Sequence, residues 1–167
     1  IKVHPSNTNT VWLAALGSPF GPNDERGIFK TTDGGKTWKK TLFVDNDHGA
    51  RDLEVDWQNP SVLYAGMYKG FRKGWDIVSG GPADKGGIYK STDGGETWKK
   101  MSAGLPGKLI GKIDIDIARS NPAVLYAIAD RLAQPEGQWQ PFDRSGLRQL
   151  VYRDPTAADC FPNSRLV

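Results

Sequence analysis

The sequence predicts an all-β protein built from repeated, four-stranded antiparallel units. Short apolar segments occur three times along the chain. An Asp-Gly-Gly hairpin occurs twice, with an offset of 60 residues between the two copies. No window of 11 or more residues shows a convincing helical period. Repetition at a steady spacing indicates a supersecondary unit that must stack on its neighbours to bury its apolar faces.

The first half of each unit is predicted to be two strands joined by a turn. In the first strand apolar and charged residues alternate, which is the period of a half-buried strand. A His-Pro or Asn-Pro turn follows, since Pro presets the turn backbone and cannot pair inside a central strand. The second strand is a short apolar run. The first strand of each unit is expected at 1–3, 53–56 and 113–117. The second is expected at 11–14, 62–65 and 124–127.

The second half of each unit is predicted to be a hairpin. Residues 27–40 recur as residues 87–100, with 11 of the 14 positions identical. Each copy reads as a strand, Gly-Ile-Phe/Tyr-Lys, an Asp-Gly-Gly turn, and a strand containing Thr-Trp-Lys-Lys. Asp-Gly is among the strongest hairpin signals because the tight turn needs positive φ.

Four-stranded units that repeat every ~40–50 residues predict the blades of a β-propeller. Residues 31–38 and 91–98 both match the Asp-box, Ser/Thr-x-Asp-x-Gly-x-Thr-Trp. The chain therefore resembles the Asp-box (BNR-repeat) β-propeller family, which includes sialidases, xyloglucanase-type glycosidases, sortilin-like receptors and photosystem assembly factors. Its Asn-Pro and Leu-Tyr-Ala segments most resemble the large bacterial sortilin-like or BNR-repeat propellers.

Residues 1–130 are expected to form an incomplete ring of about three blades, covering about 1–43, about 50–102, and from about 111. The remainder, 131–167, contains no Lys and no third Asp-box, and is expected to complete or cap the third blade. Its two strand candidates are 138–142 and 147–152. Since propellers close with four or more blades, the chain is expected to be a fragment, to complete its ring by association, or to have its open edges covered by the tail.

The repeated Asp-box residues are assigned a structural function. A metal or catalytic role for Asp33 and Asp93 is the alternative, but one active site needs one set of unlike residues. An Asp before Gly-Gly can accept hydrogen bonds from its own turn, and the Trp that follows is expected to pack over the hairpin. The structural Asp-box residues are Thr31, Asp33, Gly35, Trp38, Ser91, Asp93, Gly95 and Trp98.

Binding residues are expected on the face opposite the Asp-boxes. Strands alternate in direction, so the long loops between second and third strands share a face with the connections between units. Long loops on a rigid scaffold usually carry binding residues. These segments are 18–26, 43–51, 69–85 and 103–111. The candidate ligand-binding residues are Asp47, His48, Arg51, Asp52, Arg72, Trp75 and Asp76.

Several chemical interpretations of this face remain open. The segment 45–52 is polar, but its spacing does not fit a calcium loop, and no metal site is expected. His48 reads as a solvated loop residue. Trp75 is either a platform for a sugar ring or a protein partner, or part of a loop core. Carboxylates for glycoside hydrolysis would come from Asp24, Glu25, Asp47, Asp52 and Asp76.

The predicted function is a non-enzymatic binding or assembly scaffold for a protein or glycan ligand. The alternative is a fragment of a propeller glycoside hydrolase acting on polysaccharide. No cofactor and no catalytic residue is assigned. Sialidase activity is not expected, because the loop arginines Arg51 and Arg72 have no matching third and the sialidase N-terminal motif is absent. The partner is expected to be a protein or glycan, the remaining blades of a larger propeller, or a second copy.

The amino-acid composition further limits the kinds of partner and site that are expected. The net charge is only +3, from 22 basic and 19 acidic residues, so no nucleic-acid partner is expected. The sequence has no apolar run long enough to predict a membrane span. The single Cys160 permits neither an internal disulfide nor a cysteine zinc site. Resemblance to secreted Asp-box proteins implies a secreted or periplasmic location.

Overall fold

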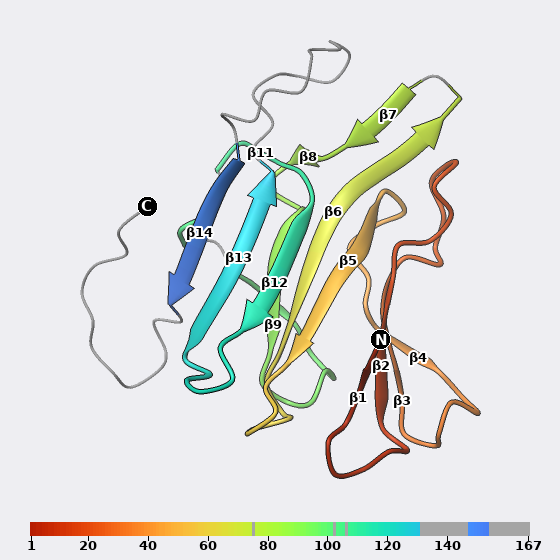
Figure 1. The fold of residues 1–167 in the computed structure, drawn as a ribbon. Helices are drawn as coiled ribbons and strands as arrows, with labels where there is room; N and C mark the ends of the chain where they lie inside the picture. The colour runs from red at the N-terminus through yellow and green to blue at the C-terminus, as the bar shows by residue number, and fades with distance from the viewer. Residues whose placement is uncertain (75, 102, 106, 131–146, 154–167) are drawn as a thin grey trace.

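The computed structural model describes residues 1–74, 76–101, 103–105, 107–130 and 147–153 (Figure 1). All of the regular secondary structure in these ranges is β, which confirms the predicted all-β class. Sheet one is antiparallel in the order β1-β2-β3-β4. Its strands are β1 (Lys2–Val3), β2 (Val11–Ala15), β3 (Gly27–Thr31) and β4 (Lys39–Leu42).

Sheet two repeats this order with longer inner strands. The antiparallel order is β5-β6-β9-β10, and β7 adds a short hairpin to the far end of β6. These strands are β5 (His48–Val55), β6 (Leu63–Lys73), β7 (Asp76–Ser79), β9 (Gly87–Ser91) and β10 (Lys99–Met101). The segment 69–85, expected as a loop, therefore contains strand residues. Beside it, β8 (Gly81–Pro82) pairs with β11 (Leu109–Ile110).

Sheet three contains β12 (Ile113–Ile117), β13 (Val124–Asp130) and β14 (Leu147–Arg153) in that order. β14 pairs antiparallel with β13 and so takes the place that β3 and β9 hold in the other sheets. The strand candidate 147–152 is thus part of a strand. The candidate 138–142 lies outside the described residues.

The three sheets stack face to face in chain order (Figure 1). Successive side chains of β6 point to opposite faces, so sheet two packs against sheet one on one face and against sheet three on the other. Leu63, Ala65 and Met67 belong to the core shared with sheet one, where they join Trp12. Tyr64 points the other way, into the core shared with sheet three. An inner sheet of the stack is therefore apolar on both faces.

The strand register shows which residues are equivalent in the three sheets. Trp12 pairs with Lys30, which precedes the first Asp-box, and Tyr64 pairs with Lys90, which precedes the second. Trp12 is therefore equivalent to Tyr64. The predicted strands 11–14 and 62–65 would instead make Trp12 equivalent to Leu63. That one-residue slip matters because it moves a side chain to the opposite face of its sheet.

Each Asp-box hairpin is held by its own side chains. The Asp33 carboxylate accepts hydrogen bonds from the Thr31 hydroxyl at 2.7 Å, and from the amide and hydroxyl of Thr37 at 2.9 and 2.6 Å. The Asp93 carboxylate makes the same three contacts with Ser91 and Thr97. The two Gly residues of each turn have φ between 72° and 90°, a region in which side chains other than Gly are strained.

The two Asp-box tryptophans lie in different environments. Trp98 packs against the core between sheets one and two, and its Nε1 donates to the Thr41 hydroxyl at 3.3 Å. Trp38 is 41% exposed, and its Nε1 donates to the Gly35 carbonyl at 3.1 Å within its own hairpin. The two residues are equivalent in the repeat, but Trp98 packs against the core shared by two sheets whereas Trp38 contacts its own hairpin.

The Asp-box carboxylates predict a loss of stability in acid. Hydrogen bonds from Thr37 lower the pKa of Asp33 from 3.8 to about 2, and those from Thr97 lower the pKa of Asp93 further. Because both pKa values are lower in the folded state, the stabilisation is complete above about pH 5 and is lost as the pH falls. In urea unfolding series, the Asp33→Asn/Asp93→Asn variant should show a shallower loss between pH 5 and pH 2 than the parent. Equal slopes would contradict this assignment.

Candidate functional site

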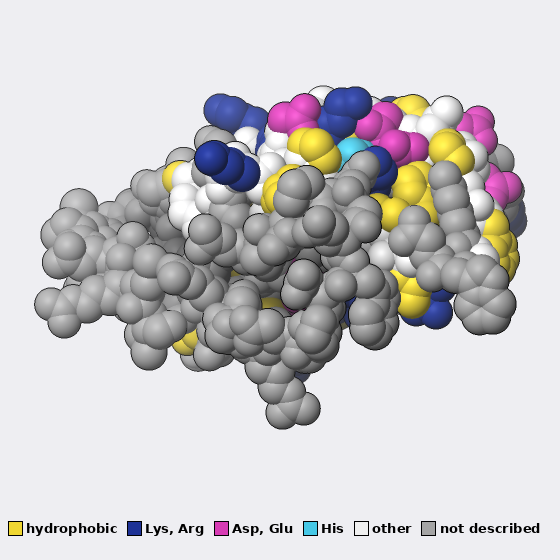
Figure 2. All heavy atoms as spheres, turned by 90° about the horizontal axis from the view of Figure 1, so that it is seen from above, with side chains coloured by type: hydrophobic (Ala, Val, Ile, Leu, Met, Phe, Trp, Pro, Cys, Tyr) yellow, Lys and Arg dark blue, Asp and Glu magenta, His cyan; other side chains and the backbone are white. Residues whose placement is uncertain are grey.

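The loop face is the end of the sheets opposite the Asp-boxes, formed by residues 18–26, 43–48 and 69–85. In Figure 1 the β6–β7 hairpin and β8 lie at one edge, and the β3–β4 and β9–β10 turns lie at the other. Figure 2 views the molecule from the loop side and shows acidic and basic side chains next to one another, with apolar side chains between them. The strand directions thus place the loops on the predicted face.

The buried side chain of Arg26 hydrogen-bonds the backbone of the segments that form this face. Its guanidinium is fully buried and donates to the carbonyls of Leu16 and Ser18 at 2.7 Å each, and to that of Gly70 at 3.2 Å. Its cationic carbon lies 5.1 Å from the centre of the Phe71 ring. Burial lowers the pKa of Arg26, although neighbouring carboxylates oppose this effect. Arg26 therefore joins the loop of sheet one to β6 of sheet two.

Arg26 was not among the predicted site residues. A signal was present, because Arg26 directly precedes Gly27 of the repeat, and the equivalent position before Gly87 is Gly86. An unlike residue at a repeated position is a sign of a contact that only one unit makes.

His48 is buried, so its interpretation as a solvated loop residue was wrong. It begins strand β5, and its Nδ1 lies 2.8 Å from an Asp45 carboxylate oxygen. The other Asp45 oxygen accepts a hydrogen bond from the Lys85 ammonium at 2.9 Å. Burial alone would raise the pKa of Asp45, but the hydrogen bonds from Lys85 and His48 outweigh it and hold that pKa well below 3.8. Nearby, Asp47 lies 3.7 Å from the Lys69 ammonium.

Arg51 and Asp52 lie in a strand, not in the loop predicted to reach residue 51. A register shift between Ala50 and Asp52 leaves Arg51 without a paired residue on β6, and such a bulge re-aims a side chain. The Arg51 guanidinium lies 3.4 Å from the Asp114 carboxylate of sheet three. The Asp52 carboxylate accepts the Ile115 amide hydrogen at 2.6 Å. Both residues therefore join sheet two to sheet three.

The remaining candidates lie along the β6–β7 hairpin. Arg72 is exposed on β6, and its backbone amide donates to the Pro19 carbonyl at 2.6 Å. Asp76 begins β7 and pairs with Lys73, but its side chain is not described. Trp75 lies outside the described residues. The structure thus brings Arg72 close to the loop of sheet one.

Tyr68 is a second residue that the sequence analysis missed. It is buried on β6, and burial raises the pKa of its phenol while Arg51, Arg26 and Arg72 lower it. Gly70 lies against the Tyr68 ring, where an added Cβ would come within 2.8 Å of a ring carbon. A single phenol therefore lies within the electrostatic reach of three arginines contributed by different segments.

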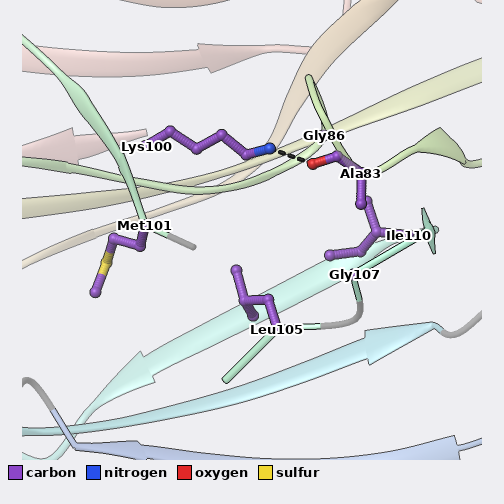
Figure 3. Close-up of a pocket in the computed structure, with 7 residues that line it drawn as sticks. All are labelled: Ala83, Gly86, Lys100, Met101, Leu105, Gly107 and Ile110. Atoms are coloured by element: carbon purple, nitrogen blue, oxygen red, sulfur yellow. Dashed lines mark hydrogen bonds between the residues drawn. The ribbon is translucent and has the colours of Figure 1, made fainter. Parts of the chain in front are cut away.

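Two small cavities lie away from this cluster. One of about 130 Å³ is lined mainly by apolar groups, with the Lys100 ammonium donating to the Ala83 carbonyl across it (Figure 3). Burial lowers the pKa of Lys100. The other, of about 210 Å³, lies beside the first Asp-box and includes Trp38 and Glu96. Within the described ranges, no three His, Cys, Asp or Glu side chains gather as a metal site, and no helix could cross a membrane.

Stacked antiparallel sheets with Asp-box hairpins are the architecture of β-propeller blades, and the chain contains two Asp-box hairpins of this kind. The BNR/Asp-box repeat family matches residues 29–40 and 89–100. The chain is 26% identical over 147 residues to the xyloglucanase Xgh74A of Acetivibrio thermocellus. The match covers 82% of this chain and 16% of that protein, so the chain spans about a sixth of the length of this relative.

Two solved structures similar to this chain are GH74 enzymes. An ancestral GH74 enzyme superposes with a TM-score of 0.60 and 22% identity, over 99% of this chain and 19% of that one. A GH74 enzyme from Niastella koreensis gives a TM-score of 0.49 and 20% identity, over 90% of this chain and 18% of that one. The first likeness confirms that the sheets are propeller blades. The sortilin-like resemblance remains a prediction.

Proposed function

We propose that the chain is a segment of a propeller glycoside hydrolase and that it contributes glycan-binding surface to that enzyme. The observation that carries this proposal is the sequence relationship to a xyloglucanase over 82% of the chain. It favours the glycosidase interpretation over the non-enzymatic scaffold that the sequence analysis placed first. The substrate class is a polysaccharide with neutral backbone sugars, of which xyloglucan is the first to test.

The charged groups on the loop face and on the strands beside it suit binding better than bond cleavage. Glycoside hydrolysis needs one carboxylic acid whose pKa is raised so that it can donate a proton. Asp45 lies beside Lys85, Asp47 beside Lys69 and Asp114 beside Arg51, and Asp52 accepts a backbone amide hydrogen. The hydrogen bonds from Lys85 and His48 outweigh burial and hold the pKa of Asp45 below its ordinary value. We therefore assign the proton donor to a residue other than Asp45.

The Arg51–Asp114 pair is the proposed sugar-binding element. Both side chains are about half exposed, and their 3.4 Å separation leaves donor and acceptor atoms available at the junction of sheets two and three. A guanidinium presents several N–H donors in one plane, and a carboxylate presents acceptors only. Together they can hydrogen-bond adjacent sugar hydroxyls. Arg72 supplies a further exposed cation on the same side of the molecule.

Calorimetric titration with xyloglucan oligosaccharides tests the proposal. Arg51→Ala should weaken binding by about tenfold to a hundredfold, since a hydrogen bond to a charged group contributes ~1.5–3 kcal/mol. Lys36→Ala is the matched control, because it removes an exposed cation from the Asp-box side. It should leave the affinity unchanged.

Reducing-sugar release is measured on the same polysaccharide. Binding without hydrolysis is the expected result for this chain alone. If no glycan in a panel of plant polysaccharides binds, the glycan-binding proposal is overturned. Hydrolysis that survives in the Arg51→Ala variant would show instead that the chain carries its own catalytic carboxylates.

A further inference from the structure

The cavity of about 130 Å³ lies at the edge of the core that sheets two and three share (Figure 3). Its walls come from the segment 83–86, from the end of β10 and from the segment 105–110. In Figure 3 the Lys100 side chain extends along one side, and Leu105 and Ile110 lie on the other. Because Ala83, Met101 and Leu105 pack against buried Ile110 and its core, the cavity is formed between these two sheets and not on an outer face of the stack.

The Lys100 ammonium is a cation whose described partner is neutral. It donates to the Ala83 carbonyl, and an ammonium has further N–H donors beyond this one. Among the residues that the structure describes, no carboxylate forms an ion pair with it. Asp84 acts from a greater distance to raise the pKa of Lys100, but burial outweighs this effect and lowers it. A charge that is partly removed from water is unfavourable unless an opposite charge accompanies it.

Lys40 is the equivalent residue of the first unit, and its ammonium has more partners. It also donates to a backbone carbonyl of the preceding loop, that of Asp24. In addition it lies 5.5 Å from the centre of the Phe29 ring and 4.5 Å from that of the Phe43 ring. Such rings stabilise a cation. At the offset of 60 residues the counterpart of Phe43 is Ala103, so the second unit keeps the lysine and lacks this ring.

The walls and the size of the cavity indicate what could accompany Lys100. Met101, Leu105 and Ile110 line it with apolar side chains, which suit an alkyl group. A cavity of ~150 Å³ can hold one benzene molecule, so about six non-hydrogen atoms fit in a space of this size. The ammonium at the wall requires that one end of the ligand be anionic.

We propose that this cavity binds a short-chain aliphatic monocarboxylate, such as butyrate. Its carboxylate pairs with the Lys100 ammonium, and its alkyl chain contacts Leu105 and Ile110. The charge-assisted hydrogen bond is stronger than the bond from Lys100 to the neutral Ala83 carbonyl. The inference is independent of the proposed glycan binding, because neither Arg51, Asp114 nor Arg72 lines this cavity.

Titration with butyrate, followed through the backbone amide signals in NMR spectra, tests the proposal. The Met101 and Ile110 amides should shift and reach saturation. Butyramide has the same size but no charge, and it should bind about tenfold more weakly or less well still. If butyrate produces no saturable shift at these amides, the proposal is overturned. Equal affinity for butyramide would overturn the pairing with Lys100.

Matched variants locate the site. Lys100→Met removes the charge and keeps a side chain of similar length, and it should weaken butyrate binding by about tenfold or more. Lys40→Met makes the same change at the equivalent position of the first unit and should leave the affinity unchanged. Ala83→Leu keeps Lys100 but fills part of the cavity, so it should also weaken binding. Amide spectra of the free variants report whether each is folded. Equal effects of Lys100→Met and Lys40→Met would contradict binding in this cavity.

Amine labelling shows whether the carboxylate contacts Lys100. Acetylation by a succinimidyl ester, measured for each lysine by mass spectrometry, requires a neutral and accessible amine. Bound butyrate should slow the labelling of Lys100, because pairing favours the ammonium form and the ligand fills the cavity. Butyramide should protect Lys100 far less, and neither compound should protect Lys40. Equal protection of Lys40 and Lys100 by butyrate would show a general effect of the salt and overturn the assignment.

Discussion

Trp12→Ala is expected to lower the free energy of unfolding by about 3–5 kcal/mol, the usual cost of removing a fully packed aromatic side chain. Trp12 is 1% exposed and belongs to the core between sheets one and two. Its Nε1 also donates to the Gly94 carbonyl at 2.9 Å, so the indole contacts the second Asp-box directly. Urea unfolding followed by intrinsic fluorescence or circular dichroism measures the change.

Trp38→Ala is the matched control for Trp12→Ala. Trp38 is 41% exposed and contacts its own hairpin, so its loss should cost about 1 kcal/mol or less. Trp12→Phe keeps most of the buried ring but removes the Nε1 donor, and should lie between the two. If Trp12→Ala and Trp38→Ala were equally destabilising, the inter-sheet core would not be the main source of stability.

Arg26→Ala is expected to destabilise the protein by about 2–4 kcal/mol, because buried carbonyl oxygens that lose their donor cost ~1–3 kcal/mol each. The affected oxygens belong to Leu16, Ser18 and Gly70. Arg26→Lys should recover only part of this loss, since an ammonium cannot reproduce the planar guanidinium fork. Thermal and urea unfolding report the stability of both variants.

Hydrogen exchange distinguishes a local from a global effect of Arg26. The Arg72 amide, which donates to the Pro19 carbonyl, should exchange faster in Arg26→Ala because the loop of sheet one is no longer held to β6. The Trp12 amide in β2 lies in a paired strand and should change only as far as global stability changes. Unchanged exchange at Arg72 would show that Arg26 does not position this loop.

The strands and hairpins were predictable because their signals are local. Alternation at 113–117 and the Asp-Gly-Gly turns determine backbone geometry within a few residues, whatever the rest of the chain does. The Asp-box hydrogen bonds are equally local, since the Asp33 carboxylate accepts them from residues between Thr31 and Thr37. Strand alternation was also enough to place the long loops opposite the Asp-boxes.

The residues of the candidate site were harder to assign because their partners are distant in the chain. His48 is buried, and the Asp45 carboxylate beside it is paired with Lys85, 40 residues away. Arg51 points to Asp114 on the next sheet. Arg26 has no counterpart in the second repeat, and its contact with Gly70 spans 44 residues. Sequence spacing carries no information on such pairs until the sheets are stacked.

The sequence by itself determined the all-β class, the order of strands within a unit and the Asp-box hairpins, since periodicity and turn chemistry act over a few residues. Only the tertiary structure decided which face of each strand is buried. It showed that Trp12 is equivalent to Tyr64, and that Trp98 is packed against a neighbour whereas Trp38 is exposed. The physical reason is that two closely similar hairpins have different neighbours, and the burial of a side chain depends on the sheet that lies beside it.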